Sequence, residues 1–247
     1  MCIRDRLCAT DIIAVSESLK SKIVELKLAK SNKIKVLGYG SSNGVDIEKF
    51  SKQFNSIPFD IKEAISGYFV IGFVGRIVKD KGIKEVVEMF KILQHRNLKV
   101  KLLILGNPEK DDSISNDDYQ YLLNHEDIVL VGQVPDPVHY FNHMDVLVSP
   151  TYREGFANVS LEAQSVEVPV ITTRATGAID TIEDNHTGFL VNVGESVGLA
   201  DKVEDLINHP SLKEEMGKNG RRRVEEKFRN EIVWKHLETI YKNNLPI

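Results

Sequence analysis

The sequence contains little cysteine and no long hydrophobic run. Its two cysteines, Cys2 and Cys8, lie at the N-terminus, with a spacing typical of neither a metal site nor a disulfide framework. Together with the absence of a signal-peptide pattern, this favours a cytoplasmic protein. No apolar stretch approaches the roughly 18 residues that a membrane-spanning helix requires. Any membrane contact is therefore expected to be peripheral, at the inner face of the plasma membrane.

The charges are nearly balanced, with 32 basic and 36 acidic residues and a net charge of -4. A nucleic-acid-binding protein usually carries a basic excess, so nucleic acid is not expected as a partner. The seven histidines show no metal-ligand spacing, and we expect no metal. The glycine-rich stretch at residues 38–46 lacks the G-x-G-x-x-G spacing of a nicotinamide-cofactor loop. We interpret it as an interdomain turn and expect no cofactor.

Short apolar runs alternate with amphipathic segments along the chain. The runs predict strands at residues 12–15, 34–37, 68–75, 100–105, 128–131, 146–149, 168–172 and 188–191. Helices are predicted after Ser16 and at residues 82–94, 135–143, 159–165 and 221–245. This alternation predicts an α/β fold with a Rossmann-like, doubly wound parallel sheet. The first six residues, MCIRDR, resemble a translated sequencing adapter and are excluded from this reasoning.

In a doubly wound sheet the ligand lies beyond the carboxyl ends of the strands, near a switch in strand order. This rule points to residues 75–82, 106–108, 132–134 and 150–158. The last of these contains Glu154 and leads into a helix that carries Glu162. Unpaired amides at the helix start near Asn158 suit a diphosphate, and the two carboxylates suit sugar and ribose hydroxyls. Two solvated acids in a capping arrangement are an equally good interpretation of the pair alone.

A second candidate cluster follows the strand at residues 68–75. Gly75 and Arg76 end that strand, and Lys81 precedes the glycine that opens the next helix. Arg76 and Lys81 could both reach one anion at the carboxyl end of the strand. An ordinary charged surface loop is the competing interpretation.

Taken in order, these motifs resemble those of the family 4 (group 1) glycosyltransferases, which have the GT-B fold. The matching segments are NGVD at 43–46, VGR at 74–76, KDKG at 79–82, EGF at 154–156 with Glu162 completing E-x7-E, PVI at 169–171, TG at 176–177 and TGFLV at 187–191. The resemblance extends from about Ala9 to the C-terminus. It implies a retaining enzyme that transfers a sugar from a nucleoside diphosphate, with UDP preferred, to a polysaccharide or lipid-linked acceptor of the cell envelope.

The resemblance also assigns roles to individual residues. Arg76 and Lys81 would hold the diphosphate, Glu154 would act in catalysis by contacting sugar hydroxyls, and Glu162 would contact the ribose. The full donor-binding set that it implies is Gly75, Arg76, Lys81, Glu154, Gly155, Phe156, Ala157, Asn158, Val159 and Glu162. Enzymes of this family typically need no metal, because cations and a helix start stabilise the leaving group.

The chain departs from the family in length, because a complete N-terminal acceptor-binding domain has no counterpart here. We therefore expect residues 1–60 to be a remnant of that domain with its linker. Residues 61–222 would form the nucleotide-sugar-binding domain, and residues 223–247 a helix that crosses to the missing domain. Exposed apolar patches are expected on residues 12–37 and on the final helix. A membrane-surface helix next to Arg221, Arg222 and Arg223 is the weaker interpretation of residues 221–245.

Two other functions stay open. The chain could bind nucleotide-sugar without transferring it, because catalysis requires both substrates in one geometry. It could also be a sugar-nucleotide epimerase on a similar fold.

Overall fold

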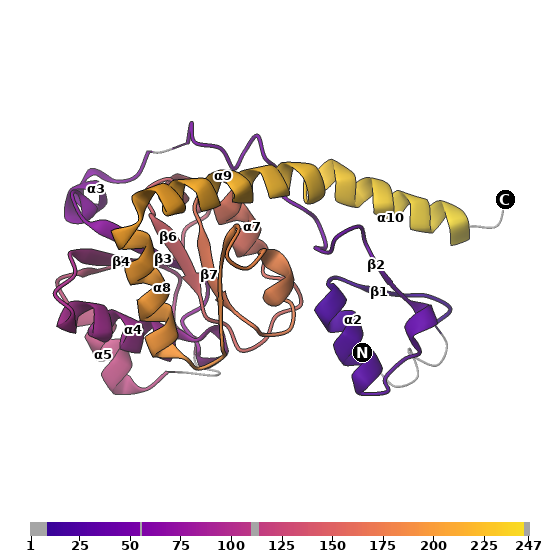
Figure 1. The fold of residues 1–247 in the computed structure, drawn as a ribbon, viewed down its shortest axis with the longest axis horizontal. Helices are drawn as coiled ribbons and strands as arrows, with labels where there is room; N and C mark the ends of the chain where they lie inside the picture. Colours follow the sequence, from indigo (N-terminus) through magenta and orange to yellow (C-terminus); the bar gives the residue numbers. More distant parts are fainter. Residues whose placement is uncertain (1–8, 55, 110–113, 245–247) are drawn as a thin grey trace.

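The computed structural model describes residues 9–54, 56–109 and 114–244. These residues form a large six-stranded sheet with its helices and a small two-stranded unit near the N-terminus (Figure 1). The adapter-like residues 1–6 lie outside the described residues. Two elements link the large and small parts, the linker after the small unit and the long C-terminal helix.

The six-stranded sheet is parallel throughout, with the strand order β5-β4-β3-β6-β7-β8. Its strands are β3 (Phe69–Val74), β4 (Val100–Leu105), β5 (Ile128–Gly132), β6 (Val146–Ser149), β7 (Val170–Thr173) and β8 (Gly188–Val191). They are continuous apolar runs because helices cover both faces of the sheet. The predicted α/β class and doubly wound parallel sheet are thus confirmed.

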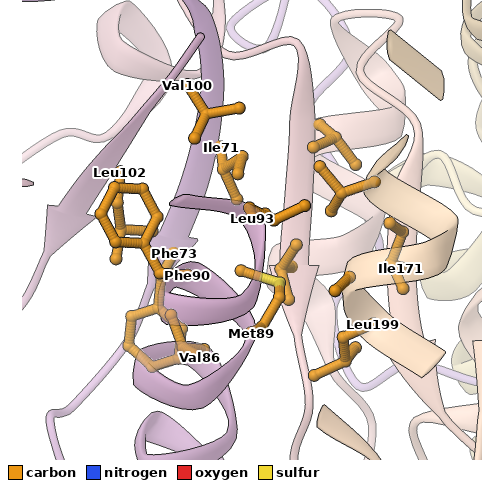
Figure 2. Packing of buried hydrophobic residues seen from close by; sticks show 14 of the residues in the cluster. Ile71, Phe73, Val86, Met89, Phe90, Leu93, Val100, Leu102, Ile171 and Leu199 are labelled. Carbon is orange, nitrogen blue, oxygen red and sulfur yellow. The ribbon is translucent and has the colours of Figure 1, made fainter. Parts of the chain in front are cut away.

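Successive side chains of a strand point to opposite faces of the sheet, and each face has its own hydrophobic core. Ile71 and Phe73 of β3 face one core, whereas Val70 faces the other. The helices around the sheet are α3 (Phe59–Ile65), α4 (Ile83–His95), α5 (Asn116–Asn124), α6 (Val138–Phe141), α7 (Asn158–Ser165), α8 (Ser196–Asn208) and α9 (Pro210–Lys227), with 3-10 turns η2 (Lys79–Lys81) and η3 (Ile179–Thr181). Helices α4 and α8 cover the first face, and α6, α7 and α9 cover the second. Figure 2 shows the first core, with Phe90 and Met89 of α4 packed beside β3.

The small unit consists of β1 (Ile12–Ala14), α2 (Glu17–Glu25), η1 (Ser31–Lys33) and β2 (Ile34–Val36). The two N-terminal apolar runs form strands as predicted, and the structure shows that β1 and β2 pair in parallel. Ser16 caps α2 as predicted, because its side-chain oxygen accepts from the Leu19 amide at 3.1 Å. The last helix, α10 (Asn230–Asn244), extends from α9 toward this unit (Figure 1).

The single helix predicted over residues 221–245 is wrong, because α9 and α10 are separate helices. Val45, in the segment that follows the small unit, pairs with the backbone between the two helices. The Val45 amide donates to the Phe228 carbonyl at 2.8 Å, and the Asn230 amide donates to the Val45 carbonyl at 3.2 Å. These two bonds occupy backbone groups that a continuous helix would need. The break therefore arises from a tertiary contact with a segment more than 180 residues earlier in the chain.

The basic run in α9 is used inside the fold. One guanidinium nitrogen of Arg221 donates to the carbonyls of Ile47, Phe50 and Ser165 at 3.2, 2.9 and 2.5 Å. Arg223 donates to the Thr181 carbonyl at 2.8 Å and pairs with a carboxylate at 3.2 Å. Two of the three cations that the membrane-surface interpretation required are thus bound to protein groups.

Some exposed apolar side chains lie on the small unit and on α10, where the sequence predicted apolar patches, although others, such as Phe59 and Val197, lie on the large domain. On the small unit they are Ile13, Val24, Leu26 and Leu28, and on α10 they are Trp234 and Tyr241. In the part of the chain that the structure describes, no helix combines the length and the apolar character needed to cross a membrane.

Candidate functional site

The topology of the sheet places a switch in strand order between β3 and β6. The chain runs from β3 outward through β4 to β5, and then returns to pair β6 on the opposite side of β3. The loops that follow β3 and β6 therefore diverge at this point, which is where doubly wound folds bind their ligands. These loops span residues 75–82 and 150–157, two of the segments that the sequence indicated.

An ion pair joins these two loops. The ammonium group of Lys81, at the end of η2, contacts the carboxylate of Glu154. Their side chains are only 25% and 19% exposed, so the two charges meet in a partly buried setting. Two residues that the sequence singled out for different roles therefore lie together.

Gly82 permits the close approach of the two loops. It has φ +72°, in the left-handed region, and a Cβ added to it would lie 2.1 Å from the Pro150 carbonyl oxygen. On the other side, Gly177 has φ +78°, and its Cβ would lie 2.4 Å from the Glu154 carbonyl oxygen. The Glu154 amide donates to the Thr176 carbonyl at 3.0 Å. The loop from Pro150 to Glu154 is thus packed closely at both of its ends, against Gly82 and against Gly177.

A second set of contacts reinforces the same loop pair. Asp80 accepts two hydrogen bonds from the guanidinium of Arg153, at 2.9 and 2.6 Å. The Asp80 carbonyl accepts from the Thr151 hydroxyl at 3.0 Å and from the Tyr152 amide at 2.9 Å. These bonds fix the spacing of the two loops on which Lys81 and Glu154 lie.

A cavity of about 540 Å³ lies above the carboxyl ends of β3, β4 and β5. This volume lies within the range of small-molecule sites. The lining residues are Val74, Gly75, Arg76, Leu105, Gly106, Asn107, Pro108, Glu109, Gln133, Val134 and Pro137. Gly75 and Arg76 are the predicted site residues in this set. Asn107 and Gln133 were indicated only through their segments, because no motif distinguished them from ordinary loop residues.

Arg76 and Lys81 bind different carboxylates. Arg76 donates to Glu109 at 2.7 Å, over β4, whereas Lys81 pairs with Glu154, over β6. Arg76 and Glu109 are 58% and 43% exposed, so their pair is readily rearranged. The convergence of both cations on one anion stays a prediction.

Helix α7 begins at Asn158, as the sequence predicted, and no side chain caps its first turn. The Asn158 side-chain oxygen accepts from the buried hydroxyl of Ser41 at 2.9 Å. The Asn158 amide donates to the Phe156 carbonyl at 3.0 Å, so that amide is not free. Ala157 is buried and Val159 packs against the core on its face of the sheet. The α7 start thus provides the positive end of a helix dipole beside the loop of Glu154.

Phe156 and Gly155 face the small unit and the C-terminal helices. Phe228 lies in the short segment between α9 and α10, and the centroid of its ring is 5.7 Å from that of the Phe156 ring. A Cβ on Gly40 would lie 2.7 Å from the Phe156 ring, and one on Gly155 would lie 3.4 Å from Val15. The side chain of Phe156 therefore anchors the loop that carries Glu154.

Glu162 lies one turn into α7 and is largely buried. Burial raises its pKa to about 7, with the positive charge of Lys49 opposing the shift and the negative charge of Asp136 adding to it. Lys49 in turn pairs with Asp136 at 2.9 Å. This environment differs from that of Glu154, so the two glutamates of the E-x7-E motif are chemically distinct.

The small unit contacts the same region through Ser18. Its hydroxyl binds the Asp180 carboxylate and accepts from the Gly177 amide at 2.7 Å. The turn at residues 176–180 thus packs against α2. Across residues 9–54, 56–109 and 114–244, no group of three or more His, Cys, Asp or Glu side chains is arranged to hold a metal ion.

A protein-family model described as "Glycosyl transferases group 1" matches residues 57–223. The capsular polysaccharide biosynthesis glycosyltransferase CapM of Staphylococcus aureus is 52% identical over 238 residues, which are 96% of this chain and 63% of that protein. A D-inositol 3-phosphate glycosyltransferase of Paenarthrobacter aurescens is 31% identical over 71% of this chain and 44% of its own length. The chain thus spans less than two thirds of the curated relatives that it matches.

Solved structures share the fold. A glycosyltransferase from Rickettsia africae has a TM-score of 0.83 at 23% identity, covering 95% of this chain and 63% of its own. HepE of Anabaena, solved in complex with UDP-glucose, has a TM-score of 0.78 at 20% identity, covering 96% of this chain and 65% of its own. The fold is therefore that of the GT-B glycosyltransferases, of which this chain corresponds to the C-terminal half.

Proposed function

Because this chain belongs to the group 1 glycosyltransferase family, we propose that it forms the donor side of an enzyme that transfers a sugar from a UDP-sugar, with retention, to a polysaccharide or lipid-linked acceptor. In this proposal residues 61–222 bind the donor. Residues 1–60 belong to the acceptor side and its linker, and residues 223–247 cross back to that side. UDP is preferred because HepE, a protein of the same fold, was solved with UDP-glucose.

The observation that carries the proposal is the Lys81–Glu154 pair at the switch point, because the loop of Lys81 begins with Gly75 and Arg76, which line the cavity over β3, β4 and β5. The cavity is large enough for a nucleoside, and Lys81 is a cation for the diphosphate. Glu154 is a carboxylate that accepts hydrogen bonds from sugar hydroxyls. Placed together with the α7 start, they provide one site for each part of a nucleotide-sugar.

The site residues act on the transition state through charge. As the sugar leaves, negative charge grows on the diphosphate, and Lys81 and the positive end of α7 stabilise it without moving. Arg76 adds a second cation at the cavity rim. Glu154 orients the sugar through its hydroxyls, which fixes the anomeric carbon relative to the leaving group.

Substituting Lys81 tests the phosphate contact. Lys81→Ala should weaken UDP binding, measured by calorimetry, roughly tenfold to a hundredfold, since a hydrogen bond to a charged group contributes about 1.5–3 kcal/mol. Lys84 offers a matched control, because it lies three residues on, is 63% exposed and pairs with Glu88 at 3.6 Å. Equal UDP affinities for Lys81→Ala and Lys84→Ala would remove Lys81 from the site.

Donor binding without transfer is a second candidate, favoured by the chain spanning 63% of the length of CapM. Incubation of the chain with a panel of UDP-sugars and a glycan acceptor separates the two. A glycoside product whose anomeric proton shows the donor configuration supports retaining transfer. Binding without product supports the second candidate, and an epimerised nucleotide-sugar would contradict both.

A further inference from the structure

The Lys81–Glu154 pair joins the two groups that the proposed function assigns to different parts of the donor. Lys81 would bind the diphosphate and Glu154 the sugar, yet they contact one another directly. Both side chains are about three quarters or more buried, so water screens their charges less than it would at the surface. A phosphate that reaches Lys81 therefore also approaches the carboxylate of Glu154.

The Glu154 carboxylate acts on that phosphate in two ways. It repels the phosphate directly, and it competes for the ammonium group of Lys81. Its backbone is fixed against the turn at Thr176 and Gly177, because the Glu154 amide donates to the Thr176 carbonyl at 3.0 Å and a Cβ on Gly177 would lie 2.4 Å from the Glu154 carbonyl oxygen. A ligand group that donates hydrogen bonds to the carboxylate offsets the repulsion.

The donor and the product differ in this respect. In a UDP-sugar the terminal phosphate is esterified and carries one charge, and the attached sugar has hydroxyls that can donate to Glu154. In UDP the terminal phosphate has a second ionisation near pH 6 and carries almost two charges at pH 7.5, with no hydroxyls beyond it. The same carboxylate is therefore favourable toward the donor and unfavourable toward the product.

Building on the proposed function, we propose that Glu154 selects the nucleotide-sugar over free UDP, and so promotes release of the product. This is selection by a repulsive element as well as an attractive one. It predicts an effect of unusual sign, since removing a charged residue of the site should tighten the binding of one ligand.

Glu154→Gln keeps the shape of the side chain and removes its charge. Calorimetry at pH 7.5 should show UDP binding about tenfold tighter than in the wild type, or about 1.4 kcal/mol. UMP lacks the terminal phosphate, so its affinity should change less than twofold. The affinity for UDP-glucose should increase less than the affinity for UDP, or should fall below that of the wild type. Glu154→Ala should change UDP affinity in the same direction, and thermal melts should show that both variants are folded.

Asp80→Asn is the matched control, because Asp80 lies on the same loop as Lys81 and is also ion-paired, with Arg153 at 2.6 Å. It removes one negative charge and retains the contacts between the loops, because the backbone carbonyl of residue 80 still accepts from Thr151 and Tyr152 and an Asn side-chain oxygen can still accept from Arg153. UDP affinity should therefore change less than twofold. If Asp80→Asn increased the affinity for UDP as much as Glu154→Gln does, the effect would be one of net charge, and the inference would be overturned.

The remaining outcomes separate the inference from the proposed function. UDP binding that is unchanged or weaker in Glu154→Gln, while the wild type binds UDP, would overturn the inference alone. A folded wild-type chain that binds neither UDP nor UDP-glucose at millimolar concentration would overturn the proposed function and this inference with it.

Discussion

The buried carboxyl group of Glu162 makes a quantitative prediction about stability and pH. Burial raises its pKa in the folded protein from 4.5 to about 7. Between these two values the folded protein binds a proton that the unfolded chain has released. The free energy of unfolding therefore falls as the pH rises through this window, and the loss is complete above pH 7.

The size of the effect follows from the shift. A difference of about 2.5 pKa units corresponds to roughly 3 kcal/mol, at about 1.4 kcal/mol per unit. Most of it is lost between pH 5 and pH 8. Glu162→Gln keeps the size of the side chain and has no charge to bury. The free energy of unfolding of this variant, relative to that of the wild type, should therefore be roughly 2–3 kcal/mol higher at pH 8 than at pH 5.

Urea unfolding followed by circular dichroism, at pH 5 and pH 8, measures this gain. Glu215→Gln is the control, because Glu215 is exposed on α9, and its difference from the wild type should be nearly the same at both pH values. The reasoning would be refuted if the free energies of unfolding of Glu162→Gln and the wild type differed by the same amount at both pH values. It would also be refuted if the variant lost stability relative to the wild type between pH 5 and pH 8. Either result would mean that the carboxylate is hydrated or fully compensated by Lys49.

Two further substitutions, each with a control variant, test the packing that supports the site. Gly82→Ala should destabilise the fold by about 2 kcal/mol or more, because it adds a Cβ at a left-handed residue against the Pro150 carbonyl. Gly198→Ala, inside α8, should instead stabilise it by about 0.5–1 kcal/mol. Phe228→Ala should cost about 3–5 kcal/mol, because this fully buried ring packs against Phe156. Trp234→Ala, at a half-exposed residue, should change stability by less than about 0.5 kcal/mol. Chemical denaturation measures all four, and a loss in Gly198→Ala equal to that in Gly82→Ala would contradict the argument from backbone conformation.

The strands of the sheet were predictable because each is a continuous apolar run. The run at residues 100–105 coincides with β4, and the run at 146–149 with β6. Both faces of these strands are buried, so almost every residue is apolar and the boundaries stand out. Local sequence was sufficient wherever burial alone decided the element.

Several helices were missed for a different reason. The buried face of α9 contains Gly217 and Gly220, whose Cβ positions would lie 2.2 Å from the Glu167 carbonyl and 2.9 Å from the Gln164 side chain. Close packing on α7 thus uses glycine where an apolar residue would have revealed the helical period. No helix was predicted at the positions of α3 and α5. Helix α8 was overlooked although Leu199, Val203 and Leu206 have helical spacing.

Glu167, two residues before Pro169, has a backbone conformation that its side chain does not explain. Its φ is +61°, in the left-handed region that favours glycine at the end of a helix. Its side chain pairs with Lys52 at 2.5 Å, an interaction that glycine could not make.

In the site, the sequence predicted which segments meet but not which partners they choose. The rule for doubly wound sheets brought the loops after β3 and β6 together. It could not show that Lys81 would bind Glu154 and that Arg76 would bind Glu109, because each cation has several acids within reach of its loop. Partner choice depends on side-chain directions that only the packed loops determine.

The position of Glu154 depends on residues that never contact a substrate in the proposed mechanism. Gly82 and Gly177 let two backbones approach within a distance that a Cβ would forbid, and Phe156 packs the end of the loop on Phe228. A catalytic group must be held to within about 0.5 Å by such supports. Because Phe228 lies where the linker separates α9 from α10, a shift of α10 would reach Glu154 through two aromatic rings. The geometry of the donor site is therefore tied to the helix that we expect to cross to the acceptor side.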